Sequence, residues 1–417
     1  MDQEGWLAAL GSYAERLHAR AGQGHHVVSP LGAWMVVALC ATLAGDEERD
    51  AWADILGADP LDAASFAAGL LAEPHPLVGA GAGLWVRSAY ATDRFHQWRD
   101  ELPPVIDSGD IPTQEQADAW ARQRTLGLIK AFPLRITGEV VLLLASALAS
   151  KVSWDVPFQV VAAAALHPSP WATRLEWVLQ PPRVGGRRGH RQFLVATERA
   201  GTVAVHLTGA RGGLLVGSVI ADDARRAAGD VLAVAEEIVT AEARAPGAIP
   251  HLSLFDLPLG EGEVWSISEE AAETKAPDGR EEQVLSVLPA WSADTDLDLD
   301  HDALGFPAAA RALEQVLVAG GYRHAARQLA MARYSAIGFE AAAVTGFMVA
   351  TSRVRTQPGI RRTAHVRFGH PFAVVAAAFD DSRRDPRAAP ISTRWNGVPV
   401  FSAWVSEPCD AEPIPGS

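Results

Sequence analysis

Helical patterns lie early in this chain and strand patterns lie late, and no flexible linker separates the two. Apolar residues recur at helical spacing from residue 5 to 20, and helical patterns continue to about residue 132. Short apolar strand patterns dominate residues 190–300 and return after residue 327. Although 417 residues could form two or three domains, the late strands are apolar enough to be buried in a sheet with the middle ones. The pattern therefore predicts one large α+β domain over residues 1–408, followed by a tail at 409–417.

The most apolar segment, "VVSPLGAWMVVALCATLAG", predicts a helix in the middle of the protein. Ser29 suits the N-cap, Pro30 suits the first turn, and residues 31–44 are apolar on every side. The run "EVVLLLASALASKVSW" predicts a strand buried on both faces. The other expected elements are two short helices within 47–73, a strand at 83–88, helices at 92–102, about 114–132 and 307–319, and strands that include 249–255 and "GVPVFSAWV".

Charge and cysteine content exclude several classes of protein. The formal charge of −14 disfavours nucleic acids and anionic membrane surfaces as partners. Cys40 and Cys409 are the only cysteines and do not form a disulfide framework, so the fold depends on packing. The N-terminal sequence lacks the pattern of a secretory signal, which predicts a cytoplasmic protein.

Motifs of common enzymes do not occur in the sequence. It has no H-E-x-x-H, no G-x-S-x-G, no P-loop and no dinucleotide-binding glycine fingerprint, so we expect neither catalysis nor a cofactor. The stretch "DTDLDLDHD" (294–302) lacks the glycine and the closing glutamate of an EF-hand, which predicts a solvated strand edge or loop. We expect "RVGGRRGHR" (183–191) to be an exposed loop, and His25 and His26 to be ordinary polar residues, so no metal site is predicted.

Five segments, in order, resemble the serpin family over nearly the whole chain, as a divergent, bacterial-type member. They are "VVSPLGAWMVVALCATLAG", "ADAWARQRTLGLI", "SALASKVSWDVPF", "LSVLPAW" and "HVRFGHPFAVVAA". The resemblance implies an α+β fold in which several helices surround a large central mixed β-sheet and two smaller sheets. It also implies an exposed reactive-centre loop, which we place at about residues 338–368. Family members often act outside cells, so an extracellular location is the alternative to the cytoplasm.

The stretch "AIGFEAAAVT" resembles the hinge of that loop, whose family pattern is Glu-Glu-Gly-Thr-Glu-Ala-Ala-Ala-x-Thr. A segment that must slide between packed strands needs small side chains, and the alanines supply them. The predicted hinge residues are Gly338, Phe339, Glu340, Ala341, Ala342, Ala343 and Thr345.

The resemblance implies a monomeric inhibitor of serine proteases and no enzyme activity of its own. In the family, the target protease cuts the loop, which inserts as a new central strand and traps the protease. The implied targets are trypsin-, elastase- or subtilisin-like serine proteases, or a cysteine protease. Ile337 and Phe339 depart from the hinge pattern. The alternative is therefore a serpin-fold binding or structural protein without inhibitory action.

The length of the family's hinge places the scissile bond between Ser352 and Arg353. Counting back from Phe372 gives Arg361 instead, and Arg355 is a further alternative. The family also controls opening of the central sheet through a polar cluster. Its expected counterparts in this chain are Ser29, Ser146, Trp154 and Gln328.

Overall fold

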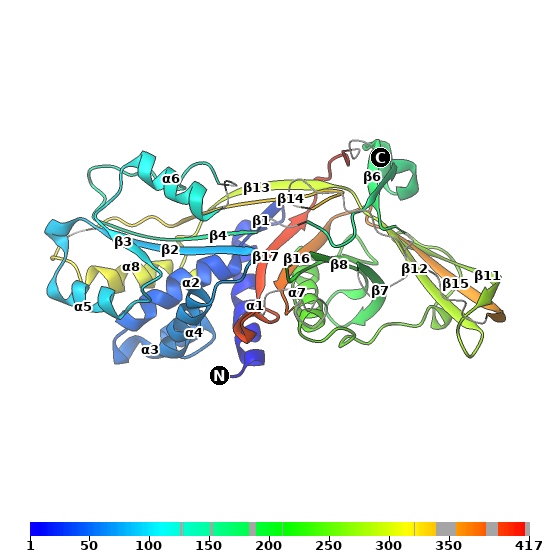
Figure 1. Cartoon of the computed structure of the whole chain (residues 1–417), viewed down its shortest axis with the longest axis horizontal. Coiled ribbons are helices and arrows are strands. Elements are labelled where there is room, and N and C mark those ends of the chain that lie inside the picture. The colour runs from blue at the N-terminus through cyan, green and yellow to red at the C-terminus, as the bar shows by residue number, and fades with distance from the viewer. Residues whose placement is uncertain are drawn as a thin grey trace.

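The computed structural model describes the chain except for residues 126, 128, 151–152, 183–188, 211, 321, 339–355, 381–390 and 413–417. Helices gather at one end of the molecule, strands run through the middle, and a sheet projects at the other end (Figure 1). The predicted α+β fold is confirmed. In the part of the chain described, no single helix is long and apolar enough to cross a membrane. Only the bent pair 46–56 and 60–72 meets that test together.

The helix predicted to be central is α2, which spans Pro30–Cys40 and is buried at all eleven positions. Ser29 caps it, because its side chain accepts from the backbone N–H of Gly32. Helices, a strand of the largest sheet and β4 all pack against α2, so the all-round apolar pattern is explained by contacts on every side. The helices that contact α2 are α1 (Gln3–Ala21), α3 (Arg49–Leu56), α4 (Pro60–Ala72) and α8 (Phe306–Glu314). Helix α5 (Asp93–Glu101) lies at the same end of the molecule.

The largest sheet is antiparallel and has six strands in the order β1-β17-β16-β9-β8-β7. Helix α7 (Ala228–Arg244) packs against β9, β16 and β17 and buries a separate apolar cluster there. The strands are β1 (His26–Val28), β7 (His190–Thr197), β8 (Gly201–Ala210), β9 (Leu214–Ala221), β16 (Phe372–Ala378) and β17 (Pro399–Val405).

The projecting sheet has the order β10-β11-β15-β12, with bounds Gly260–Glu261, Trp265–Thr274, Gln357–Arg367 and Arg280–Val287. Its strand β15 lies between β11 and β12, antiparallel to the first and parallel to the second. The C-terminal part of the reactive loop expected over about 338–368 thus falls within this sheet, because residues 357–366 pair with β11 and residues 360–367 pair with β12. A small two-stranded sheet, β5 (Gln159–Ala162) with β6 (Trp177–Gln180), lies between the body and this sheet.

The remaining strands form two separate pieces. One is the mixed sheet β3-β2-β4, with bounds Asp107–Gly109, Val78–Val86 and Leu142–Ser150. The other is the antiparallel pair of β13 (Trp291–Asp298) and β14 (Arg327–Tyr334). Helix α6 (Gln114–Arg124) covers one side of β4 and α2 the other (Figure 1).

The clearest differences between the predicted elements and the structure are a helix that ends early, a strand that does not form and a helix that was not predicted. The helix expected over 114–132 ends at Arg124, and Gly127 beyond it has a φ of 81° that a helix does not permit. Residues 249–255 do not form a strand; Ser253 instead caps the short 3-10 turn Leu254–Asp256. Helix α7 lies inside the stretch expected to contain strands. Its apolar residues recur at helical spacing, but the neighbouring segments are rich in β-branched residues, which favoured a strand prediction.

Candidate functional site

Strands β4 and β14 face each other but are joined only beyond their C-terminal ends. Among the residues described, no sheet hydrogen bond links the two strands themselves. An antiparallel bridge pairs Ser153 with Gly338, and the backbone N–H of Trp154 donates to the carbonyl of Ile337 over 3.2 Å. We call this contact the junction. It closes one end of the space between the strands and leaves their N-terminal halves apart.

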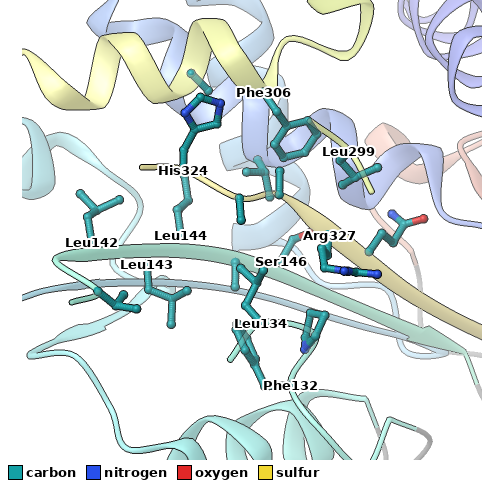
Figure 2. Close-up of a pocket in the computed structure, with 18 of the residues that line it drawn as sticks. Phe132, Leu134, Leu142, Leu143, Leu144, Ser146, Leu299, Phe306, His324 and Arg327 are labelled. Atoms are coloured by element: carbon teal, nitrogen blue, oxygen red, sulfur yellow. The ribbon is translucent and has the colours of Figure 1, made fainter. Parts of the chain in front are cut away.

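A cavity of about 780 Å³ fills the space between those halves, and we call it the slot. Figure 2 shows Leu142, Leu143, Leu144 and Ser146 on β4, with Phe306 and His324 on one side of the strand and Phe132 and Leu134 on the other. The lining thus comes from both faces of the sheet, so the slot passes through its plane. A strand placed there would extend the sheet and bury apolar side chains on both faces.

Three of the four residues predicted to control sheet opening meet at the slot, around the N-terminus of α2. The side-chain amide of Gln328 on β14 accepts from the backbone N–H of Ser29 over 3.0 Å and donates to its carbonyl over 2.9 Å. On β4, the hydroxyl of Ser146 donates to the carbonyl of Gly32 over 2.7 Å. Each strand is therefore tied to α2 and not to the other strand, which holds the slot open.

The fourth predicted residue, Trp154, lies at the junction instead of the slot. Its side chain is buried, and the indole N–H donates to the carbonyl of Ser335 over 2.9 Å. The Ser335 hydroxyl donates to the carbonyl of Gly338 over 2.6 Å. Gly338 has a φ of 129°, which residues with a side chain rarely adopt. The chain thus leaves β14 through a tight, hydrogen-bonded turn.

Two histidines, His190 and His206, lie close to the junction. His190 falls within the segment 183–191 that was predicted to be an exposed loop, but it begins β7 and is not exposed, while residues 183–188 lie outside the described part of the chain. The backbone N–H of Phe158 donates to the carbonyl of Ala336, and the Phe158 ring contacts the rings of His190 and His206. The two imidazoles are 3.0 Å apart, from Nδ1 of His190 to Nε2 of His206. Burial lowers the pKa of His190 to about 4 and the pKa of His206 well below its usual value, so both rings are neutral at pH 7.

Most of the predicted loop residues lie outside the part of the chain that the structure describes. This holds for Ser352, Arg353 and Arg355 and for every hinge residue after Gly338. Arg361 is described, and it lies within β15, paired with Glu270 on β11 and Glu281 on β12. A protease needs an extended, accessible chain, so this placement argues against Arg361 as the reactive residue. Among the described residues, no cluster of acidic, histidine or cysteine side chains could hold a metal ion.

Comparison with solved structures identifies the fold. A highly specific serpin of the insect Tenebrio molitor matches with a TM-score of 0.57 and 13% identity, over 98% of this chain and 99% of that one. The thermophilic serpin tengpin in its native state gives 0.60 and 12%, over 98% and 95%. Human thyroxine-binding globulin, complexed with its ligand, gives 0.60 and 11%, over 97% and 99%.

Sequence comparison gives no such relation, because no family model and no curated protein matches the chain. The structural matches nevertheless span almost the full length of both partners in each case. The chain has the serpin fold.

Proposed function

We propose that this protein inhibits serine proteases by inserting its own cleaved loop into the slot. The protease's serine Oγ attacks a carbonyl within residues 339–355, the peptide bond breaks, and the new amine leaves with the C-terminal part of the chain. The protease is then bound as an ester to the free end of the loop. The loop folds back from Gly338 and pairs with β4 and β14 before water hydrolyses the ester. The bound protease is carried along and distorted.

The position of the slot supports this proposal most directly. Both strands run towards the junction, so a chain that turns back at Gly338 runs antiparallel to β4 and to β14 at once. Antiparallel pairing on both sides is the geometry that a returning hairpin segment can adopt without a crossover. Segment 339–355 follows Gly338 directly in the sequence, so the segment that must insert begins at the junction, where the slot ends.

The test is incubation with trypsin, elastase and subtilisin, followed by a denaturing gel and an assay of residual protease activity. An adduct that survives SDS, together with lost protease activity, supports the trap. The same incubation with papain tests a cysteine protease as target. A nicked chain with fully active protease in every case would refute the proposal.

The second candidate is a serpin-fold binding or structural protein that does not inhibit. Ile337 is half-buried at the junction, and the bulky Phe339 follows directly where the family's pattern has small or polar residues. Burying such a ring in a sheet costs about 1–3 kcal/mol and slows the first step of insertion. Thyroxine-binding globulin, which shares the fold, was solved as a complex with a small molecule. This candidate predicts a nicked chain in the protease test.

A further inference from the structure

We infer that a buried chain of hydrogen bonds through His26, His18 and Ser402 is an acid-sensitive switch, and that it controls the polar contacts that hold the slot open. We call it the histidine chain. It joins α1 to β1 and β17, three elements that meet near the middle of the molecule (Figure 1). The consequence for trapping rests on the proposed function, whereas the switch itself can be tested without a protease.

The histidine chain consists of three contacts of normal hydrogen-bond length. Nδ1 of His26 lies 2.8 Å from the carbonyl oxygen of Gly24. Nε2 of His26 lies 2.8 Å from Nδ1 of His18. Nε2 of His18 lies 2.7 Å from Oγ of Ser402. The side chains of His26, His18 and Ser402 are 3%, 5% and 2% exposed, so solvent does not compete for these contacts.

The contacts fix the positions of the hydrogens while both rings are neutral. A carbonyl oxygen only accepts, so Nδ1 of His26 carries the hydrogen and donates it to Gly24. Nε2 of His26 is then an acceptor, and Nδ1 of His18 donates to it. Nε2 of His18 accepts in turn from the Ser402 hydroxyl. Both neutral rings are therefore Nδ1–H tautomers, and all four ring nitrogens have a partner.

An added proton disturbs this arrangement at either ring. On Nε2 of His26, the proton would face the Nδ1–H of His18 across a 2.8 Å contact. On Nε2 of His18, it would face the hydroxyl hydrogen of Ser402, which would have to turn away. Either way, a positive charge would be created in the protein interior, where it is costly unless a carboxylate is paired with it.

The strands and the helix next to the histidine chain do not supply such a carboxylate. Among the described residues, neither ring bonds to an acid. Strand β17 and helix α2 contain no charged residue. On β13 and β14, Thr295 and Gln328 face β1, so strand alternation turns the charged residues of these strands to the opposite side. Those residues are Asp294, Asp296, Asp298, Arg327 and Arg333.

The charged groups on α1 and α7 do not stabilise a protonated ring either. On α1, Glu15 bonds to Arg199, whereas Arg16 and Arg20 are themselves positive. Helix α7 contacts both α1 and β17. Burial raises the pKa of its Glu236 to about 8, so this carboxyl is uncharged at pH 7.

Burial therefore dominates the titration of both rings. It lowers the pKa of His18 to about 3, and it lowers the pKa of His26, where a charged His25 acts in the same direction. Once exposed to water, both rings return to an ordinary pKa of about 6.5. Acid thus favours an opened form, and the histidine chain is lost as the pH falls.

The histidine chain anchors β1 directly beside the slot. Strand β1 is an edge strand of three residues, and it pairs with β17. Ser29 follows it and makes both bonds to Gln328 on β14. The Ser29 hydroxyl also donates to the carbonyl of Val400, two residues before Ser402 on β17. Release of His26 therefore loosens β1 where β14 is tied to α2, and the slot is no longer held open.

Nitrogen-15 NMR of the histidine side chains tests the histidine chain itself. At pH 7, we expect His18 and His26 to be neutral Nδ1–H tautomers, with each signal identified by its loss in the His18→Asn or His26→Gln variant. An Nε2–H tautomer or a charged ring at either position would overturn the inference.

Hydrogen–deuterium exchange tests the response to acid. The measured quantity is the protection of amides 27–33 at pH 7 and pH 5, corrected for intrinsic exchange rates. Each ring that regains an ordinary pKa on opening lowers this protection by up to about 25-fold. His26→Gln keeps an acceptor for His18 but takes no proton, so its response should be weaker. His96→Gln, at an exposed site on α5, should respond like the wild type.

An equally strong response in His26→Gln and the wild type would contradict the switch. If His26→Gln does not fold, His18→Asn provides the same test, because it keeps a donor for His26 and removes the other titrating ring.

Adduct formation with subtilisin connects the switch to the slot. At pH 5.5, we expect the wild type to give fewer SDS-stable adducts and more nicked chain than His26→Gln. At pH 7 the two proteins should be equal, and comparison at one pH removes the effect of pH on the protease. Equal adduct yields at pH 5.5, despite a clear exchange response, would refute the connection to the slot. If no adduct forms at either pH, the proposed function fails, while the NMR and exchange results still decide the switch.

Discussion

Gln328 offers a quantitative test of how the slot is held open, because one side chain makes both bonds between β14 and Ser29. Gln328→Ala removes a 3.0 Å and a 2.9 Å hydrogen bond. The carbonyl of Ser29 still accepts from the N–H of Ala33, but the buried N–H of Ser29 loses its partner. Two bonds at about 0.5–1.5 kcal/mol each give an expected loss of about 1–3 kcal/mol in the free energy of unfolding.

Equilibrium unfolding in urea measures this loss, with Gln123→Ala as the matched control. Gln123 is exposed on α6, so its replacement by alanine should change the free energy of unfolding by no more than about 0.5 kcal/mol. Thermal unfolding is a coarser check, because a chain of this length shifts by only about 1 °C for each kcal/mol. If the Gln328 and Gln123 variants were equally stable, the tie between β14 and α2 would not hold the strand.

Three further predictions concern backbone strain and titration. Gly338→Ala should destabilise the protein by about 1–3 kcal/mol because of the positive φ at the junction. Gly229→Ala in α7, where the added methyl meets open space, should not destabilise it; urea unfolding compares the two. Burial raises the pKa of Glu236 to about 8, so stability falls as pH rises from about 4.5 through 8, where only the unfolded chain releases this proton. Glu236→Gln should flatten that part of the stability profile, and an unchanged slope would contradict the assignment. Burial lowers the pKa of His75 and His190 to about 4, so the unfolded chain binds more protons below about pH 6.5 and stability should fall from there towards pH 4. His75→Gln should reduce that loss in urea titrations at pH 5 compared with pH 7, and an equal loss in both proteins would argue against the burial of His75.

Periodicity and capping predicted the elements whose signals are local. Ser29, Pro30 and the all-round apolar run after them define α2 without any tertiary information, and the structure confirms that helix. Helix α7 was missed for the opposite reason. A strand at residues 228–244 is excluded only by the packing of the helix across β9, β16 and β17, which is a long-range property.

The polar residues of the slot were predicted through the resemblance to the family's motifs, but the slot itself was not predicted. Ser29, Ser146 and Gln328 come from three distant segments, and only the fold brings them together. The separation of β4 from β14 depends on the register and spacing of strands some 180 residues apart, which no local pattern encodes. The pair of His190 and His206 likewise gives no local signal, because the two rings lie on the neighbouring strands β7 and β8 and meet only when these strands pair.

The proposed mechanism requires the slot to be a vacant strand position that the cut loop fills. Thermal unfolding of the intact protein and of the protein cleaved within residues 339–355 tests it most directly, with circular dichroism as the signal. A filled slot adds backbone pairing on both sides and fills a cavity of about 780 Å³, so the cleaved protein should melt at a clearly higher temperature. An equal or lower melting temperature after cleavage would contradict the claim.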